Sequence, residues 1–182
     1  MRVIAGTARG IRLAALPGEE ITRPTVDRVK EAMFSSLQFL LPGAQVLDLF
    51  AGSGQLGIEA LSREASGCVF VDENRAAIRV ISQNCRDAGV ADRSRIVTGN
   101  AETFLAGSRE TFDIILLDPP YHKGTLEKIL PRVAEITRPG GTVLCESEKG
   151  LQLPEECGGL KLKKQHRYGT VLVTRYEKER EE

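Results

Sequence analysis

Short runs of apolar residues alternate with stretches of helical length over most of this chain, from residue 44 onward. Three of these runs, VLDLF, CVFV and FDIILLD, are nearly continuous in apolar character. Such runs are typical of strands buried on both faces of a parallel sheet, because a half-exposed antiparallel strand alternates polar and apolar residues. We therefore predict strands at residues 45–49, 67–72, 94–98, 112–118 and 141–146.

The segments between these predicted strands have the length and pattern of helices. In the segment 74–88, Ile78, Ile81 and Cys85 recur at spacings of three and four, which places them on one helix face. The helices are predicted at residues 56–63, 74–88, 101–107 and 125–137. A series of strands and helices with right-handed crossovers predicts an α/β fold with a doubly wound, Rossmann-like sheet.

Both ends of the chain depart from this alternation. Residues 160–167 and 170–177 are strand-like and are joined by Tyr168-Gly169, which predicts an antiparallel hairpin at the end of the sheet. Near the N-terminus, residues 2–5 and 11–14 predict a small hairpin.

A helix is predicted at residues 25–41, with Thr25 as its N-cap, because apolar residues recur there at helical spacing. We divide the chain into an N-terminal extension of hairpin and helix, residues 1–42, that packs on one α/β domain, residues 43–182. A length of 182 residues suits one such domain with a short extension.

The charge balance limits how the protein could bind nucleic acid. With 25 Lys and Arg against 25 Asp and Glu, the formal net charge is zero, which excludes a histone-like protein that binds by bulk charge. No apolar run approaches the roughly 18 residues of a membrane helix, and the N-terminus lacks the pattern of a signal peptide. We expect a soluble, cytoplasmic monomer. The four cysteines form no CxxC pair, so we expect reduced thiols and no metal site.

A glycine-rich loop follows the first strand of the predicted domain, from Asp48 to Gly57, and Gly52, Gly54 and Gly57 match the pattern GxGxxG. Glycines allow the backbone to turn sharply and to approach a ligand at a helix N-terminus. Asp72 lies 20 residues beyond Gly52, at the end of the second strand, where a carboxylate can accept both hydroxyls of a ribose. The loop and the acid together predict a ligand that carries a ribose.

Two features favour S-adenosylmethionine over a dinucleotide as that ligand. The Asp48 carboxylate could hold an ammonium group or an ordered water, but it would repel a pyrophosphate. The third strand is followed by Gly99-Asn100-Ala101, so that Asn100 could read the edge of an adenine. Asn100 is equally suited to cap the next helix, and the two roles do not exclude each other.

The fourth strand ends in Asp118-Pro119-Pro120-Tyr121, at the sheet edge where doubly wound folds bind ligands. The prolines remove two backbone donors and hold the chain extended. The Asp118 carboxylate and the Pro119 carbonyl remain as acceptors, and together they could position an NH₂ group and direct its lone pair. Tyr121 offers a flat face for a base. The alternative is that this segment only ends a strand, with Tyr121 covering the core.

The segments LDLFAGSGQLGIEALSR, FVDENRAAI, GNA and ILLDPPY resemble the class I S-adenosylmethionine-dependent methyltransferases that methylate amines. The N-terminal VIAGTARGIRL and TRPTVDRVKEAMFSSL and the C-terminal HRYGTVLVTRYE narrow the resemblance to the RsmD family, over nearly the whole chain. This family methylates the exocyclic N2 amine of a guanine in small-subunit (16S) ribosomal RNA. The resemblance implies that residues 43–182 form a methyltransferase domain with seven strands, the last one antiparallel.

The resemblance also implies the site. The guanine would be held by the catalytic residues Asp118, Pro119, Pro120 and Tyr121. S-adenosylmethionine would be bound by Asp48, Phe50, Ala51, Gly52, Ser53, Gly54, Gly57, Asp72, Glu73, Asn100 and Ala101. Two departures from the family pattern are that Asn100 stands where related enzymes often have Asp, and that residues 157–164 match no motif.

Basic residues are unevenly distributed along this neutral chain. The first sixteen residues contain arginines and no acid, and residues 161–167 form a second basic run without an acid. Because Gly6 and Gly10 predict a flexible hairpin with little apolar content, we expect this end of the chain to contact RNA phosphates. The RNA-binding residues predicted are Arg9, Arg12, Arg23 and Arg28. For the C-terminal run we favour a solvated strand face.

Other functions remain possible on the sequence alone. A DNA adenine N6-methyltransferase uses the same amine chemistry, but it usually carries a target-recognition region for which this chain has no room. A protein-glutamine methyltransferase usually has Asn at position 118. A nicotinamide-dependent oxidoreductase would also use GxGxxG, yet it gives no account of the Asp-Pro-Pro-Tyr segment. A non-catalytic RNA-binding module leaves the cofactor loop unexplained.

Overall fold

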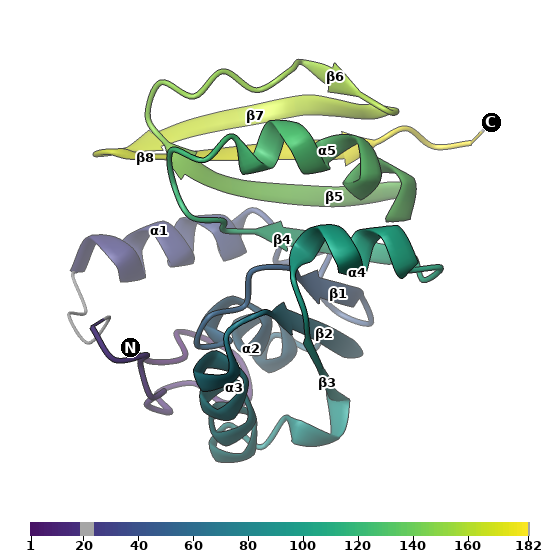
Figure 1. Ribbon diagram of the computed structural model, residues 1–182. Coiled ribbons are helices and arrows are strands. Elements are labelled where there is room, and N and C mark those ends of the chain that lie inside the picture. The colour runs from purple at the N-terminus through teal and green to yellow at the C-terminus, as the bar shows by residue number, and fades with distance from the viewer. Residues whose placement is uncertain (19–23, 182) are drawn as a thin grey trace.

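The computed structural model describes residues 1–18 and 24–181, which form one sheet with helices on both faces (Figure 1). The strands are β1 (Gln45–Asp48), β2 (Gly67–Asp72), β3 (Ser94–Thr98), β4 (Phe112–Leu117), β5 (Thr137–Glu148), β6 (Glu156–Cys157), β7 (Leu160–Tyr168) and β8 (Val171–Lys178). The helices are α1 (Pro24–Ser35), α2 (Gln55–Ser62), α3 (Arg75–Asp87), α4 (Ala101–Gly107) and α5 (Thr125–Ile136), with a 3₁₀ turn at Ala91–Arg93. Within the described ranges, no helix is long and apolar enough to cross a membrane.

The order of strands in the sheet is β3-β2-β1-β4-β5-β8-β7-β6. The first five strands in this order are parallel, and β8 lies antiparallel between β5 and β7. The predicted α/β fold with a C-terminal antiparallel hairpin is therefore confirmed. The expected count of seven strands is wrong, since β6 is an eighth. Gly158 and Gly159 both have positive φ and turn the chain back, so that the two residues of β6 pair with β7.

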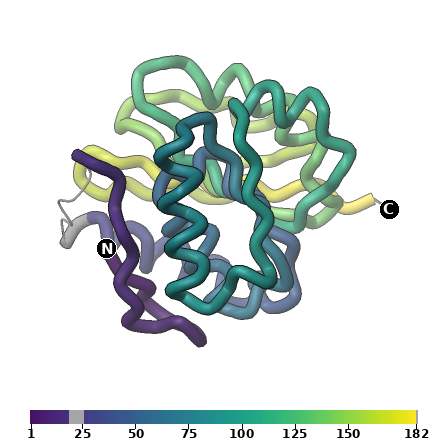
Figure 2. Tube along the Cα trace, turned by 60° about the horizontal axis from the view of Figure 1, so that its bottom comes forward, coloured from purple at the N-terminus to yellow at the C-terminus, as the bar shows by residue number. Residues whose placement is uncertain are grey.

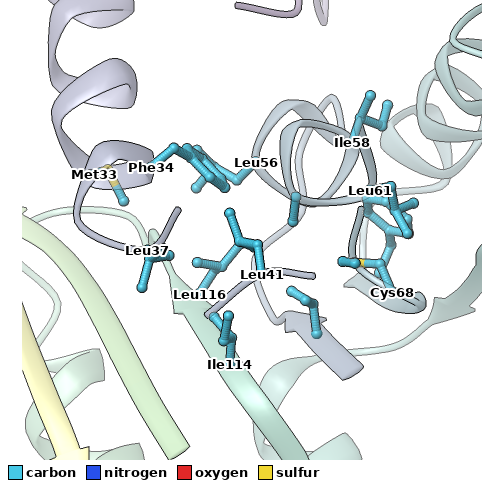
Figure 3. Packing of buried hydrophobic residues seen from close by; sticks show 14 of the residues in the cluster. Met33, Phe34, Leu37, Leu41, Leu56, Ile58, Leu61, Cys68, Ile114 and Leu116 are labelled. Atoms are coloured by element: carbon cyan, nitrogen blue, oxygen red, sulfur yellow. The ribbon is translucent and has the colours of Figure 1, made fainter. Parts of the chain in front are cut away.

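The side chains of the central strands divide between two hydrophobic clusters, one on each face of the sheet. Helices α1, α2 and α3 cover one face, and α4 and α5 cover the other. Figure 3 shows the first cluster, in which side chains of α1 and α2 meet those of β4. Burial on both faces explains why these strands appear in the sequence as continuous apolar runs. It also explains why Cys68 and Cys145 are core residues.

The helix of the N-terminal extension is shorter than predicted and begins earlier. It starts at Pro24, so Thr25 lies inside the first turn and is not the N-cap. A proline suits this first position because the missing N–H has no partner there. The helix ends at Ser35, after which the Ser36 hydroxyl donates to the Met33 carbonyl at 2.6 Å, a local bond that competes with helix continuation.

The first residues of the chain are anchored to the core, in contrast to the flexible hairpin predicted. A single bridge between Arg2 and Arg12 stands where two paired strands were expected. Val3 and Leu13 are buried in the core, and Figure 2 shows this segment running beside α3. A Cβ atom on Gly6 would lie 1.8 Å from a backbone oxygen of α2. Gly6 is therefore needed for close contact and does not supply flexibility.

A buried carboxylate on α2 binds this anchored segment. Glu59 is fully buried and accepts hydrogen bonds from the backbone N–H groups of Ile4 and Ala5 at 2.9 and 3.1 Å. The Arg63 guanidinium donates to the same carboxylate at 3.0 Å, and the Lys30 amine on α1 lies 3.3 Å away. Burial lowers the pKa of Lys30, and Glu59 opposes that change. This ion cluster joins the N-terminal segment, α1 and α2.

Replacing Glu59 with Gln should destabilise the protein strongly. The side chain keeps its shape, but the buried Lys30 amine loses its counter-charge, which typically costs about 3–5 kcal/mol. Urea unfolding monitored by circular dichroism measures the loss. Glu102→Gln is the matched control, because it removes the exposed ion pair with Lys128 at 2.9 Å and should cost less than about 1 kcal/mol. Equal small losses in both variants would contradict this role of Glu59.

Candidate active site

A cleft with a volume of about 690 Å³ lies at the carboxyl edge of the parallel strands. Its walls come from the segments that follow β1, β2, β3 and β4, because parallel pairing brings the ends of these strands to one edge. The predicted site residues that line it are Phe50, Gly52, Asp72, Glu73, Asn100, Ala101, Asp118, Pro119, Pro120 and Tyr121. Those that do not line it are Asp48, Ala51, Ser53, Gly54 and Gly57.

The glycines of the loop have three different physical roles. Gly52 and Gly54 have φ values of +56° and +82°, which L side chains rarely adopt. Gly54 also forms the N-terminal boundary of α2. At Gly57, a Cβ atom would lie 2.3 Å from the ring of Phe70 on β2. The third glycine therefore allows α2 to pack closely on the sheet, while Gly52 lets the backbone border the cleft.

Asp72 both shapes the loop and faces the cleft. One carboxylate oxygen accepts a hydrogen bond from the backbone N–H of Gly52, and the other accepts one from the N–H of Asn74, each at 2.8 Å. Each carboxylate oxygen can accept more than one hydrogen bond. Asp72 can therefore bind hydroxyl groups of a ligand in the cleft while it holds the glycine loop in place.

Asp48 lies beneath the glycine loop. The side chain is buried, and its Oδ2 accepts a hydrogen bond from the Gly57 backbone N–H at 3.0 Å. Burial raises the pKa of Asp48 to about 7, with a smaller increase from Asp72 and an opposing decrease from the Gly57 N–H. Its Oδ1 is buried and has no hydrogen-bond partner among the described residues. An unpartnered buried acceptor of this kind fits a ligand that brings a donor, such as an ammonium group.

Asn100 caps α4, as one of its two predicted roles requires. Its side-chain oxygen accepts a hydrogen bond from the Thr103 backbone N–H at 2.8 Å. The residue also lines the cleft, and the amide group keeps two donors. Adenine recognition by Asn100 stays a prediction that is compatible with this cap.

A second carboxylate, which was not predicted from the sequence, lies beside the Asp-Pro-Pro-Tyr segment. The Tyr121 hydroxyl donates to Glu146 on β5 at 2.9 Å. Burial raises the pKa of Glu146, while the hydrogen bond from Tyr121 opposes that rise; burial also raises the pKa of Tyr121. In the sequence, Glu146 is recognisable as an acid at the end of an apolar run. Asp118 has the equivalent position at the end of the neighbouring strand β4.

The residue after Tyr121 adopts an unusual backbone conformation. His122 has a φ of +60°, and its backbone N–H donates to the Glu148 carboxylate at 3.1 Å. The His122 ring packs edge-on against Tyr121, with 6.3 Å between centroids. Positive φ is uncommon outside glycine, so the contact with Glu148 holds the turn that follows Tyr121. Lys123 and Thr125, beyond this turn, still line the cleft.

Three of the predicted RNA-binding arginines lie outside this cleft. Arg9, Arg12 and Arg28 are exposed, and Arg23 lies outside the described residues. All four cysteines are free thiols. In the part of the chain that the structure describes, no three His, Cys, Asp or Glu side chains are grouped so that they could hold a metal ion.

Asp48→Asn should remove a pH dependence of stability. Burial raises the pKa of Asp48 to about 7 in the folded protein, whereas the ordinary pKa of this side chain is 3.8. The free energy of unfolding of the wild type, relative to the variant, should therefore fall as the pH rises from 3.8 to about 7 and then level off. Urea titrations across this range measure the difference, with the exposed Asp92→Asn as the control. A difference that does not change with pH would contradict the raised pKa.

Comparison with known proteins agrees with this geometry. A family model described as "Conserved hypothetical protein 95" matches residues 1–177. A Bacillus subtilis protein named "Putative rRNA methyltransferase YlbH" is 39% identical over 183 residues, which cover 98% of this chain and 99% of the relative. The Escherichia coli K12 protein named "Ribosomal RNA small subunit methyltransferase D" is 40% identical over 130 residues, covering 71% of this chain and 65% of the relative.

A solved structure described as "Putative methyltransferase yhhF from Escherichia coli" superposes with a TM-score of 0.86 at 33% identity, and the match covers 100% of this chain and 99% of that one. The matches include the N-terminal extension as well as the α/β domain. The resemblance seen in the sequence motifs is confirmed. The chain belongs to the RsmD family of class I methyltransferases.

Proposed function

We propose that this protein transfers the methyl group of S-adenosylmethionine to the exocyclic N2 amine of a guanine in 16S ribosomal RNA. One observation carries the proposal. A single cleft joins Asp72, at the edge of the glycine loop, to the acceptors of the Asp118–Tyr121 segment. The relatives named as ribosomal RNA methyltransferases support RNA as the substrate. We further propose a monomer that needs no metal ion and acts on the RNA or on the small ribosomal subunit.

The residues around the glycine loop fit S-adenosylmethionine. When bound, it supplies a methyl group on a positively charged sulfur, which needs alignment more than further activation. Asp72 would accept the ribose hydroxyls, and Asn100 would donate to the adenine edge. Asp48 does not line the cleft, so its unpartnered oxygen would reach the ammonium group through an ordered water or a small shift of the glycine loop. Gly52 would allow the backbone to approach the ligand closely.

On the other side of the cleft, the Asp118–Tyr121 segment would hold the amine. The Asp118 carboxylate and the Pro119 carbonyl accept its two hydrogens, which directs the nitrogen lone pair away from them and toward the methyl donor. As the nitrogen gains the methyl group it releases one proton, and the Asp118 carboxylate accepts that proton. Tyr121 stacks on the base.

A second carboxylate near Asp118 supports guanine as the target base. Glu146 and Asp118 line the same small cavity of about 90 Å³ on the α1 side of the cleft. Guanine presents its N1–H next to its N2 amine, so it offers adjacent donors to two acidic side chains. Adenine presents an acceptor next to its amine, and a carboxylate would repel that acceptor.

The proposal is tested by offering labelled S-adenosylmethionine with three substrates and identifying the labelled nucleoside. The substrates are free 16S ribosomal RNA, small subunits that lack the modification, and double-stranded DNA. We expect label in N2-methylguanosine from one or both RNA substrates. Label in N6-methyladenine from DNA would instead establish the adenine alternative, and label in no nucleic acid would overturn the proposal.

Asp118→Ala should abolish most turnover and leave S-adenosylhomocysteine affinity nearly unchanged, because the carboxylate acts on the amine. Tyr121→Phe should retain substantial activity through ring stacking, although Glu146 loses its donor. Tyr121→Ala should lose about 1–3 kcal/mol of base binding. Single-turnover assays and calorimetric titration measure these effects. If Phe proved as damaging as Ala, the hydroxyl contact with Glu146 would matter more than stacking.

We propose that Arg9, Arg12 and Arg28 contact phosphates of the RNA, and Arg23 is proposed on sequence grounds alone. Replacing Arg9 and Arg12 together with Gln should weaken RNA binding and reduce the slope of log affinity against log salt by about 0.7–0.9 for each lost contact. The melting temperature should not change, because both side chains are exposed. An unchanged salt slope would show that these arginines do not contact the RNA.

A further inference from the structure

A groove lies between α1 and the hairpin of β7 and β8. It consists of two cavities, of about 290 and 270 Å³, that share Tyr168 in their walls. Lys164, His166 and Arg175 line the larger cavity beside the end of α1, and Arg28 and Arg167 line the smaller one. Among the described residues, no Asp or Glu lines either cavity. We call these two cavities the hairpin groove.

The concentration of positive charge in the hairpin groove is a local property, since the chain as a whole is neutral. Lys164 lies directly opposite Arg175 in the register of β7 and β8, an arrangement of like charges that is unfavourable by itself. Arg175 contacts Glu177 at 2.7 Å and the Ser36 carbonyl at 3.2 Å. Its Nε is buried without a hydrogen-bond partner in the described part of the chain. Because Arg175 is paired with Glu177, the cations of the groove that an anion could contact are the exposed Lys164, Arg167 and Arg28.

The hairpin groove leads to the candidate active site. The small cavity beside Asp118 and Glu146 is also lined by Val29 and Met33 of α1. Val29 belongs to the wall of the smaller cavity of the groove, and Met33 to that of the larger. The groove therefore continues along α1 to the residues that would hold the target amine.

We propose that the hairpin groove binds the sugar–phosphate backbone of the RNA strand that carries the target guanine. The proposal rests on the proposed function, which makes a strand with a displaced base the substrate. Phosphate groups match the cations of the groove, and contacts of this kind position the strand without reading its sequence. The rings of His166 and Tyr168, 6.3 Å apart, lie on the hairpin where flanking bases could stack. The basic run at residues 161–167 is thus more than a solvated strand face.

The test is the affinity of Lys164→Gln/Arg167→Gln for a short, fluorescently labelled single-stranded RNA, measured by anisotropy over a range of salt concentrations. Both side chains are exposed, so we expect the fold and the affinity for S-adenosylhomocysteine to be retained. Counterion release predicts that the slope of log affinity against log salt is smaller by about 1.4, and that the double variant binds the RNA roughly 25-fold more weakly at about 0.1 M salt.

The control is Arg86→Gln/Arg109→Gln, which removes the same charge from exposed positions outside the groove and should leave the slope unchanged. Arg28→Gln removes one cation from the opposite wall, and it should lower the slope by about 0.7. If the double variant unfolds, the salt slope of Arg28→Gln alone shows whether the hairpin groove binds the RNA.

The proposal is overturned if the groove variants keep the wild-type slope, or if the control lowers it equally. Methylation assays with the wild type separate this result from a failure of the proposed function. If the wild type methylates RNA and the groove variants bind RNA as tightly as the wild type, only the proposal that the hairpin groove binds RNA is refuted. If the wild type methylates no RNA but the groove variants bind RNA more weakly, only the proposed methyltransferase function on RNA is refuted.

Discussion

The structure around the candidate active site depends on the contacts of the fully buried Glu59 carboxylate. This carboxylate accepts backbone hydrogen bonds from the first residues of the chain and lies between Lys30 of α1 and Arg63 of α2. Helix α2 begins at the glycine loop, and α1 forms one wall of the hairpin groove. A carboxylate buried in this way is stable only when several donors replace the lost water. The same contacts therefore fix the N-terminal segment, the glycine loop and α1 relative to one another.

Charge is separated within this neutral chain. Asp48, Asp72, Asp118 and Glu146 gather near the carboxyl edge of the parallel strands, whereas the hairpin groove contains cations and no acid among the described residues. An acidic cleft suits a positively charged methyl donor and an amine, and it disfavours the pyrophosphate of a dinucleotide. We infer that a polyanionic substrate binds the cationic groove and presents only a base to the cleft.

Much of the fold could be predicted from the sequence, because strands covered on both faces leave long apolar runs. Helices α2 to α5 lie within a residue or so of their predicted bounds. The end of α1 depends on a local hydroxyl bond of Ser36, and the short β6 depends on a two-glycine turn, so neither leaves a periodic signal. The glycine loop and the Asp118–Tyr121 segment were recognisable because their residues are consecutive. Glu146 was not, because only the pairing of β4 with β5 brings it to Tyr121.

We infer that one cleft places the methyl donor at the glycine loop and the target amine at Asp118. A crystal structure of the protein with S-adenosylhomocysteine tests it most directly. We expect the ribose hydroxyls to contact the Asp72 carboxylate, the adenine to lie beside Asn100 and the sulfur to point toward Asp118. A ligand bound outside the cleft, or one whose ribose does not contact Asp72 and whose sulfur points away from Asp118, would contradict it.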